Sequence, residues 1–281
     1  MDTNLPLRDT LRLLFGAEPF FGDATYGAQT PARESLLLTA LVSLLEQRDR
    51  PLRILEIGSW IGFSALTWAY ALACFANGSG SVLCIDPWAA YLSESDAAAK
   101  DLYRGMNTLL ETGLAYELFQ HNAGCGPAGV RIDHIRGAGA DILPTLERES
   151  FDIVYVDGSH YYDAVKADLL VARQLVVDGG ILAGDDLEWQ LGKDIDEATV
   201  RAEIERDYVK ARGYHPGVTL AVAEILGSVD AIGRTWFMRR QGNGYTGLDL
   251  TPARMIIAPH WPPAMKADAR TLLAPAKTGA G

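Results

Sequence analysis

The sequence predicts an α/β fold built on a doubly wound, mostly parallel sheet. Five short apolar segments alternate with longer helical patterns over residues 51–184. Buried parallel strands consist of such continuous apolar runs, because helices cover both faces of the sheet. Glycines or acidic residues directly follow several of these segments, where an open α/β sheet binds its ligands. A last strand, at 234–240, is expected to run antiparallel.

The composition is that of a globular protein with an acidic surface. The chain has 281 residues, is 48% hydrophobic and carries a formal net charge of -11. Such a charge disfavours binding to nucleic acid or to an anionic membrane surface, so we expect neither as a partner. The sequence leaves open whether the protein forms a homo-oligomer.

The cysteines and the apolar segments point to the cytoplasm. Cys74, Cys84 and Cys125 form no CxxC pair and are expected to be reduced thiols. The N-terminus lacks the pattern of a signal peptide, and the longest apolar stretch, 65–76, is too short to span a bilayer. We therefore expect a cytoplasmic protein.

Hydrophobic periodicity and turn residues place the elements. The expected strands are 51–57, 81–86, 130–135, 151–156, 179–184 and 234–240. The expected helices are 7–14, 32–48, 63–76, 94–114, 139–148, 160–174, a solvated charged helix at 193–213, and 215–227. In the helix at 32–48, which Thr30 and Pro31 open, Leu37, Leu41, Leu44 and Leu45 share one face.

No internal repeat or linker divides the chain, so one domain is a sufficient account. Residues 1–30 are an N-terminal extension, and 31–245 form the domain, with a helical insertion near 190–215. Residues 246–281 form a C-terminal extension that ends in a flexible tail, 271–281.

The first informative segment is ILEIGSWIGFSA, residues 54–65. A strand ends near Glu56, Gly58 begins a tight turn, and Gly62 is expected to let the backbone approach a ligand. This spacing differs from the GxGxxG of nicotinamide and flavin folds, where glycines bring a helix N-terminus against a pyrophosphate. An acidic Glu56 facing the bound molecule suits an ammonium and a sulfonium better than phosphates.

The second segment is VLCIDPW, residues 82–88. A carboxylate at Asp86, where the second strand ends, can accept both hydroxyls of a ribose. The alternative is that Asp86 only caps the turn before Pro87. Trp88 either stacks on an adenine or closes the core.

With Glu56, Gly58, Gly62 and Asp86 in register, the sequence resembles the class I S-adenosylmethionine-dependent methyltransferases. Residues 151–187 look like the subgroup of macrolide-sugar and aminocoumarin O-methyltransferases and CmcI-type proteins. The resemblance spans residues 30–240 and implies a Rossmann-like fold. The cofactor-binding residues expected from it are Glu56, Gly58, Ser59, Gly62, Asp86, Trp88, Gly137 and Ala138.

Three carboxylates follow two neighbouring strands of the predicted sheet. Asp157 follows the fourth strand, and Asp185 and Asp186 follow the fifth, so a right-handed crossover brings them to one edge. They would repel one another unless a hard cation such as Mg²⁺ lay between them. The alternative is that they cap the next segment and hold loop amides. The resemblance also implies that they are divalent-metal ligands.

His160 lies three residues after Asp157. It is either the general base that removes the acceptor's proton or a helix-start residue bonded to a carboxylate. Asp157 is the other candidate base. The remaining histidines have no comparable setting, although His215 is expected near the pocket. The acceptor wall is expected from residues 1–30 and 186–215.

We therefore expect metal-assisted O-methylation of a small-molecule hydroxyl, on a sugar or another secondary metabolite. One alternative is a metal-independent methyltransferase or a CmcI-like protein of other activity. Another is a catalytically silent, cofactor-binding scaffold. A nicotinamide dehydrogenase is disfavoured by the glycine spacing.

Overall fold

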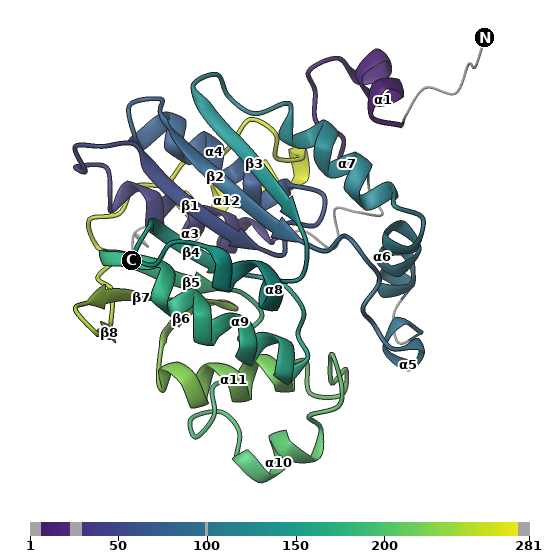
Figure 1. The fold of residues 1–281 in the computed structure, drawn as a ribbon, viewed down its shortest axis with the longest axis vertical. Helices are drawn as coiled ribbons and strands as arrows, with labels where there is room; N and C mark the ends of the chain where they lie inside the picture. The colour runs from purple at the N-terminus through teal and green to yellow at the C-terminus, as the bar shows by residue number, and fades with distance from the viewer. Residues whose placement is uncertain (1–6, 23–29, 99–100, 275–281) are drawn as a thin grey trace, which may run out of the picture.

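The computed structural model describes residues 7–22, 30–98 and 101–274. Its centre is one sheet, in which five parallel strands lie in the order β3-β2-β1-β4-β5 (Figure 1). These strands are β1 (Leu52–Ile57), β2 (Gly80–Asp86), β3 (Val130–Arg136), β4 (Phe151–Val156) and β5 (Val176–Gly184). The strand order reverses between β1 and β4, and open α/β sheets bind ligands at the carboxyl ends of the strands at such a point.

The parallel part of the sheet continues into antiparallel strands. β7 (Thr235–Gln241) pairs antiparallel with β5, as the sequence predicts for the last strand. Two strands that the sequence does not predict flank it: β6 (Asp230–Ile232) and β8 (Gly244–Thr246), of three residues each. Segments this short carry too few residues to show a period of two.

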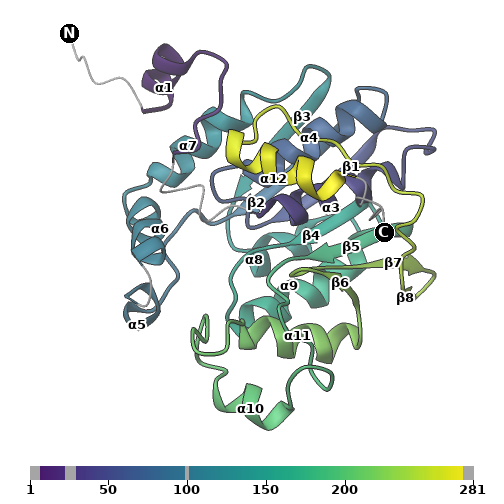
Figure 2. The ribbon, with the colours of Figure 1, turned by 180° about the vertical axis from the view of Figure 1, so that it is seen from behind.

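Helices cover both faces of the sheet. α3 (Ala32–Ser43), α4 (Phe63–Phe75) and α12 (Pro263–Leu273) lie on one face (Figure 2). α9 (Tyr162–Leu175) and α11 (Pro216–Leu226) lie on the other, with the short α8 (Gly139–Ile142) and η1 (Leu143–Thr145). Neighbouring strand residues alternate between these faces: Ile54 packs with core residues on the α4 face, and Leu55 packs with core residues on the α9 face. This arrangement confirms the doubly wound α/β fold.

The helix predicted at 94–114 is three helices. They are α5 (Glu94–Ala97), α6 (Asp101–Glu111) and α7 (Leu114–Ala123). Gly113 has a positive φ of 76° and separates α6 from α7. Two other helices are shorter than predicted. The helix predicted at 32–48 ends at Ser43, and the α-helix predicted at 139–148 ends at Ile142.

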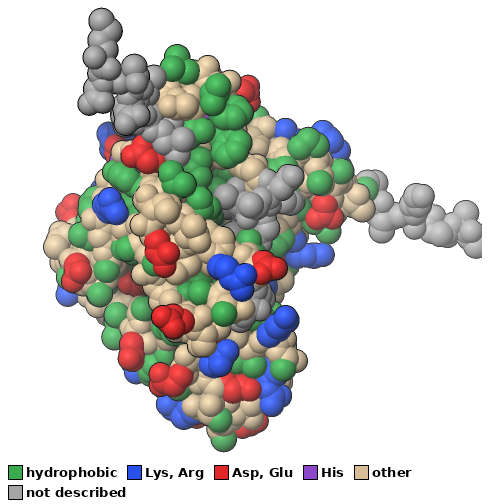
Figure 3. Space-filling model, turned by 90° about the vertical axis from the view of Figure 1, so that its right-hand side faces the viewer, with side chains coloured by type: hydrophobic (Ala, Val, Ile, Leu, Met, Phe, Trp, Pro, Cys, Tyr) green, Lys and Arg blue, Asp and Glu red, His purple; other side chains and the backbone are tan. Residues whose placement is uncertain are grey.

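The prediction of a charged helix at 193–213 is also wrong. Only α10 (Glu197–Ala202) is helical there, and the rest forms turns. The lower end of the molecule, which α10 forms, mixes acidic and basic side chains on its surface (Figure 3). Asp207, by contrast, is fully buried and hydrogen-bonded to His160, so this part of the segment packs inside the protein.

Both ends of the described chain pack on the domain. α1 (Leu7–Phe15) confirms the predicted N-terminal helix and lies against α7. In the C-terminal extension, Trp261 is buried and its Nε1 donates to Thr67 of α4. The predicted tail is helical through Leu273, and residues 275–281 lie outside the described part. No described helix has the length and apolar composition needed to cross a membrane.

Candidate active site

A cavity of about 350 Å³ opens at the carboxyl ends of the parallel strands. Its walls come from the turns after β1, β2, β3, β4 and β5, and from α6. The predicted site residues that line it are Gly58, Ser59, Asp86, Ala138, Asp157, His160, Asp185 and Asp186. The topology therefore brings most of the predicted cofactor and metal residues together around one space.

The turn after β1 lies against the turn after β4. Gly58 donates its N–H to the Ile85 carbonyl, and Asp157 donates its N–H to the Ile57 carbonyl, each at 2.8 Å. Gly58 has a φ of 86°, and a Cβ there would overlap the carbonyl oxygen of Asp157. Only glycine fits this position, because both its φ and its neighbours exclude a side chain.

Gly62 has a different role from the predicted one. It does not line the cavity but is the N-cap of α4, with a φ of 86°. A Cβ there would lie 3.3 Å from the Phe119 ring. Helix packing, rather than the approach of a ligand, therefore accounts for this glycine.

Asp86 lies at the end of β2, as predicted, and its carboxylate joins two turns. It accepts hydrogen bonds from the backbone N–H of Trp60 at 3.0 Å and of Trp88 at 2.6 Å. Burial raises the pKa of Asp86 to about 6. Each oxygen keeps lone pairs for a further donor from the cavity.

Trp88 is a core residue, in agreement with the second of its two interpretations, in which it closes the core. Its ring is fully buried beside Phe119 and Tyr116 and does not line the cavity. Its Nε1 donates to the Trp60 carbonyl at 2.7 Å, which holds the ring away from the ligand space.

Two further residues expected at the cofactor do not line the cavity. Glu56 is fully buried, and its carboxylate accepts a hydrogen bond from the Cys84 thiol instead of facing the cavity. Burial raises the pKa of Glu56 to about 7. Gly137 donates its N–H to the Asp86 carbonyl at 3.0 Å and leaves the cavity wall to Ala138.

The three predicted carboxylates converge. One oxygen from each of Asp157, Asp185 and Asp186 lies within 4.8 Å of the others. Arg234 contacts two of them, with Nη1 2.7 Å from Asp186 and Nη2 3.5 Å from Asp185. Asp157 accepts no side-chain hydrogen bond from any described residue. An all-oxygen donor set with excess negative charge fits a hard divalent cation.

Burial and neighbouring charges shift the pKa values of these acids. Burial and the adjacent carboxylates raise the pKa of Asp157 well above its usual range and that of Asp185 to about 7. Burial also disfavours the charge of Asp186, but His160, His215 and Arg234 hold its pKa far below the usual range.

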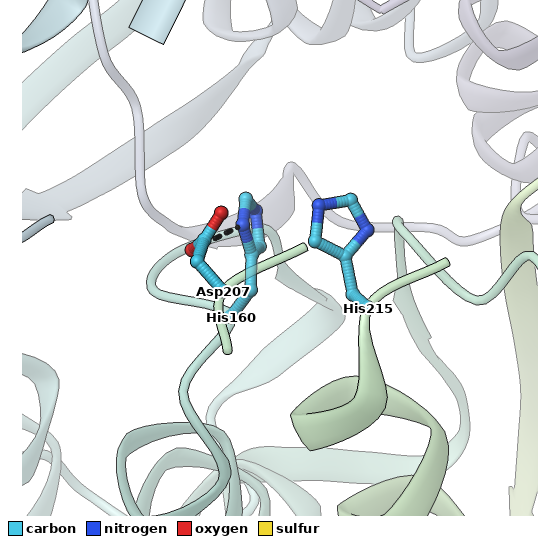
Figure 4. Close-up of side chains that lie close together, drawn as sticks. All are labelled: His160, Asp207 and His215. Carbon is cyan, nitrogen blue, oxygen red and sulfur yellow. Dashed lines mark hydrogen bonds and ion pairs between the residues drawn. The ribbon is translucent and has the colours of Figure 1, made fainter. Parts of the chain in front are cut away.

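His160 lies between two carboxylates. Its Nδ1 is 3.0 Å from Asp207, and its Nε2 is 3.0 Å from Asp186 (Figure 4 shows the first pair). Burial disfavours the imidazolium, but Asp207 and Asp186 raise the pKa of His160 well above its usual value. Of the two interpretations of His160, the histidine bonded to carboxylates agrees with this geometry. Its chemical role stays a prediction.

Part of this chain matches a known protein family. Residues 55–187 match the model of a family described as a methyltransferase domain. This segment contains the glycine turn, Asp86 and all three converging carboxylates. The chain contains a methyltransferase domain. Among curated proteins, no sequence matches it.

Among the solved structures that resemble this chain, NovP supports the fold. The O-methyltransferase NovP has a TM-score of 0.52 and 16% identity, over 74% of this chain and 80% of that one. The calicheamicin methyltransferase CalS11 has a TM-score of 0.47 and 17% identity, over 85% and 87%. The O-methyltransferase TomG from Streptomyces achromogenes, solved with S-adenosylmethionine, has 0.41 and 20%, over 84% and 96%.

Sequence reasoning missed several residues of the methyltransferase site. His215 lines the cavity, as expected, but its partners were not predicted: its ring centroid lies 4.2 Å from that of His160, and its Nδ1 lies 3.1 Å from Glu188. Asp207 is one of many acids in a charged run, and nothing in the sequence distinguishes it. Arg234 lies in the turn just before β7 and belongs to no motif.

The predicted acceptor wall is only partly correct. Of the described residues in the N-terminal extension, Thr30 alone lines the cavity. His215 lines it from the later segment. The remaining wall comes from the loop after β2 and from α6, which contribute apolar and aromatic side chains: Tyr91, Leu102, Tyr103, Met106 and Leu110.

Proposed function

We propose that this methyltransferase methylates a hydroxyl oxygen of a small molecule, with help from a divalent cation at Asp157, Asp185 and Asp186. The observation that carries the proposal is the convergence of these three carboxylates in the same cavity as Gly58 and Asp86. The class of enzyme requires a methyl donor and an acceptor to lie side by side. We place the donor on the β1–β2 side of the cavity and the acceptor on its β4–β5 side.

The β1–β2 side fits the methyl donor. S-adenosylmethionine supplies a methyl group on a positively charged sulfonium. The glycine at position 58 leaves the backbone of the turn open to the cavity, because a side chain has no room there. The Asp86 carboxylate has lone pairs for ribose hydroxyls, and Ala138 with Pro87 offers apolar surface for an adenine.

The β4–β5 side fits the acceptor hydroxyl. A hard cation held by the three carboxylates would lower the pKa of a bound hydroxyl. Asp157 is the better-placed proton acceptor, since it lines the cavity without a side-chain hydrogen bond, whereas both nitrogens of His160 contact carboxylates. The apolar and aromatic wall from α6 suits an acceptor with an apolar ring body, such as a sugar-bearing or phenolic secondary metabolite.

One observation favours metal-independent transfer as the second candidate. Arg234 already lies against Asp185 and Asp186, so a guanidinium offsets part of their charge without a metal. In this version the ionised form of Asp157 accepts the proton from the acceptor directly, and the arginine favours the ionised forms of the other two acids.

Methyl transfer from radiolabelled S-adenosylmethionine to a panel of sugar and phenolic hydroxyls separates these possibilities. We expect EDTA to abolish transfer, Mg²⁺ to restore it, and binding of S-adenosylhomocysteine to be unchanged by EDTA. Full transfer in EDTA would establish the metal-independent mechanism. Cofactor binding without transfer to any hydroxyl, with or without Mg²⁺, would instead favour a catalytically silent scaffold.

A further inference from the structure

We propose that His160, Asp207 and His215 form a second metal site, which takes a divalent transition-metal ion. One ligand atom from each of the three residues lies within 4.8 Å of the others. His160 comes from the loop before α9, Asp207 from the turns after α10, and His215 from the N-cap of α11 (Figure 4). The site lies beside the three-carboxylate group and does not depend on the proposed methyl acceptor.

Two buried atoms in this cluster have no hydrogen-bond partner among the described residues. They are Nε2 of His215 and Oδ2 of Asp207. The side chain of His215 is 3% exposed and that of Asp207 is 1% exposed. Leaving buried polar atoms unpaired is costly, and a cation bound by both atoms would remove that cost.

The second nitrogen of each histidine is held by a carboxylate. Nδ1 of His215 lies 3.1 Å from both oxygens of Glu188, and Nε2 of His160 lies 3.0 Å from Asp186. In His215 the carboxylate that accepts the Nδ1 proton fixes the tautomer and leaves Nε2 with its lone pair. In His160 the ion would displace the proton that Nδ1 shares with Asp207, as metal binding to histidine releases protons. Metal-binding histidines are oriented in this way, by a carboxylate behind each ring.

The spacing of the ligand atoms also suits an ion. Nδ1 of His160 lies 3.0 Å from Oδ1 of Asp207. Ligands on adjacent positions of an ion with bonds of about 2.1 Å lie about 3 Å apart. The ligand atom of His215 lies within 4.8 Å of those of His160 and Asp207. His160 and His215 both line the cavity, which gives an ion and a bound molecule access to the remaining positions.

The donor set indicates the kind of metal. Two imidazoles and one carboxylate favour Fe²⁺, Co²⁺, Ni²⁺ or Zn²⁺ over Mg²⁺, which prefers oxygen. Five carboxylates crowd this part of the cavity: Asp157, Asp185, Asp186, Glu188 and Asp207. Among the described residues, Arg234 is the one Lys or Arg that pairs with any of them. Two divalent ions and this arginine would balance the five charges.

Cobalt binding tests the proposal. We expect the protein, dialysed against Co²⁺ in a large excess of Mg²⁺, to retain one Co²⁺ with the visible absorption of a nitrogen-ligated ion. His215→Ala and Asp207→Ala should lose both the ion and the absorption. Asp185→Asn should keep them, because it alters only the oxygen site. His134→Ala, a histidine beside Trp88 in the core, is the matched control and should also keep them.

Two further measurements make the result decisive. Calorimetric binding of S-adenosylhomocysteine to each variant shows that the fold is intact, independently of any metal. Glu188→Gln keeps all three ligands but weakens the support of His215, and should lower the Co²⁺ affinity about 10- to 100-fold. Wild-type protein that retains no Co²⁺, or a His215→Ala variant with unchanged Co²⁺ content and absorption, would overturn the site. Neither result would touch methyl transfer, which is assayed separately.

Discussion

Gly58 and Asp157 meet backbone to backbone: a Cβ on Gly58 would occupy the place of the Asp157 carbonyl oxygen. The contact joins the turn after β1 to the turn after β4, at the point where the strand order reverses. One side of the cavity is therefore coupled rigidly to the other. The spacing between the cofactor turn and the first converging carboxylate depends on the missing side chain.

Gly58→Ala should destabilise the protein more than Gly62→Ala. Both glycines have a φ of 86°, so the alanines share a conformational cost of about 1–2 kcal/mol. At position 62 the new methyl lies 3.3 Å from the Phe119 ring, whereas at position 58 it would overlap backbone atoms, which adds roughly 1–3 kcal/mol. Urea denaturation of both variants measures the difference. Equal losses would mean that the two turns are not packed as described.

Asp86→Asn should weaken binding of S-adenosylhomocysteine about 10- to 100-fold, because charge-assisted hydrogen bonds contribute about 1.5–3 kcal/mol. Calorimetry gives the affinity. Asp133→Asn is the control, since Asp133 pairs with Arg131 outside the cavity on the neighbouring strand. An unchanged affinity in Asp86→Asn, with the control also unchanged, would remove Asp86 from the cofactor site.

Glu56 should make the stability of the ligand-free protein depend on pH. Its pKa is about 7 in the folded state against an ordinary value of 4.5, so the folded protein binds the proton more tightly. The burial cost is therefore absent well below pH 4.5 and complete above pH 7. Glu56→Gln removes this titration, and between pH 5 and pH 8 its stability relative to wild type should rise by about 2 kcal/mol. Parallel pH profiles in chemical denaturation would contradict this.

Asp185→Asn should lower the affinity for Mg²⁺ at least tenfold and leave folding in EDTA intact or improved. The change removes one of three converging charges and keeps the shape of the side chain, so repulsion in the metal-free protein falls. Magnesium titration followed by thermal unfolding reports both effects. Asp178→Asn, at an exposed position of the same strand, serves as the control. Identical Mg²⁺ responses in the two variants would exclude the oxygen site.

The parallel sheet and the converging acids could be predicted because they follow from local patterns. Apolar runs specify buried strands, and acids placed directly after neighbouring parallel strands must meet at one edge. Asp157, Asp185 and Asp186 accordingly lie together. The direction of a single side chain is not set in this way, and Glu56 and Trp88 both point into the core instead of the cavity.

The second half of the site depends on contacts between distant segments. Asp207 lies 47 positions after His160, in a run of charges whose average pattern predicts a solvated helix. Its burial becomes apparent only when the loop before α9 and the turns after α10 are placed side by side. The same holds for α6, whose cavity-lining residues belong to a segment that the sequence presents as one polar helix.

The distribution of tryptophans gives the protein a built-in optical reporter. Of the six tryptophans, Trp60 lines the cavity. Four others are fully buried away from its walls: Trp68, Trp88, Trp236 and Trp261. The sixth, Trp189, is half-buried and stacks on Tyr214 outside the cavity walls. These five indoles contribute a background emission, while the emission of Trp60 changes when a ligand displaces water beside it. Occupancy of the cavity can thus be followed by intrinsic fluorescence, without a label and without knowing the acceptor.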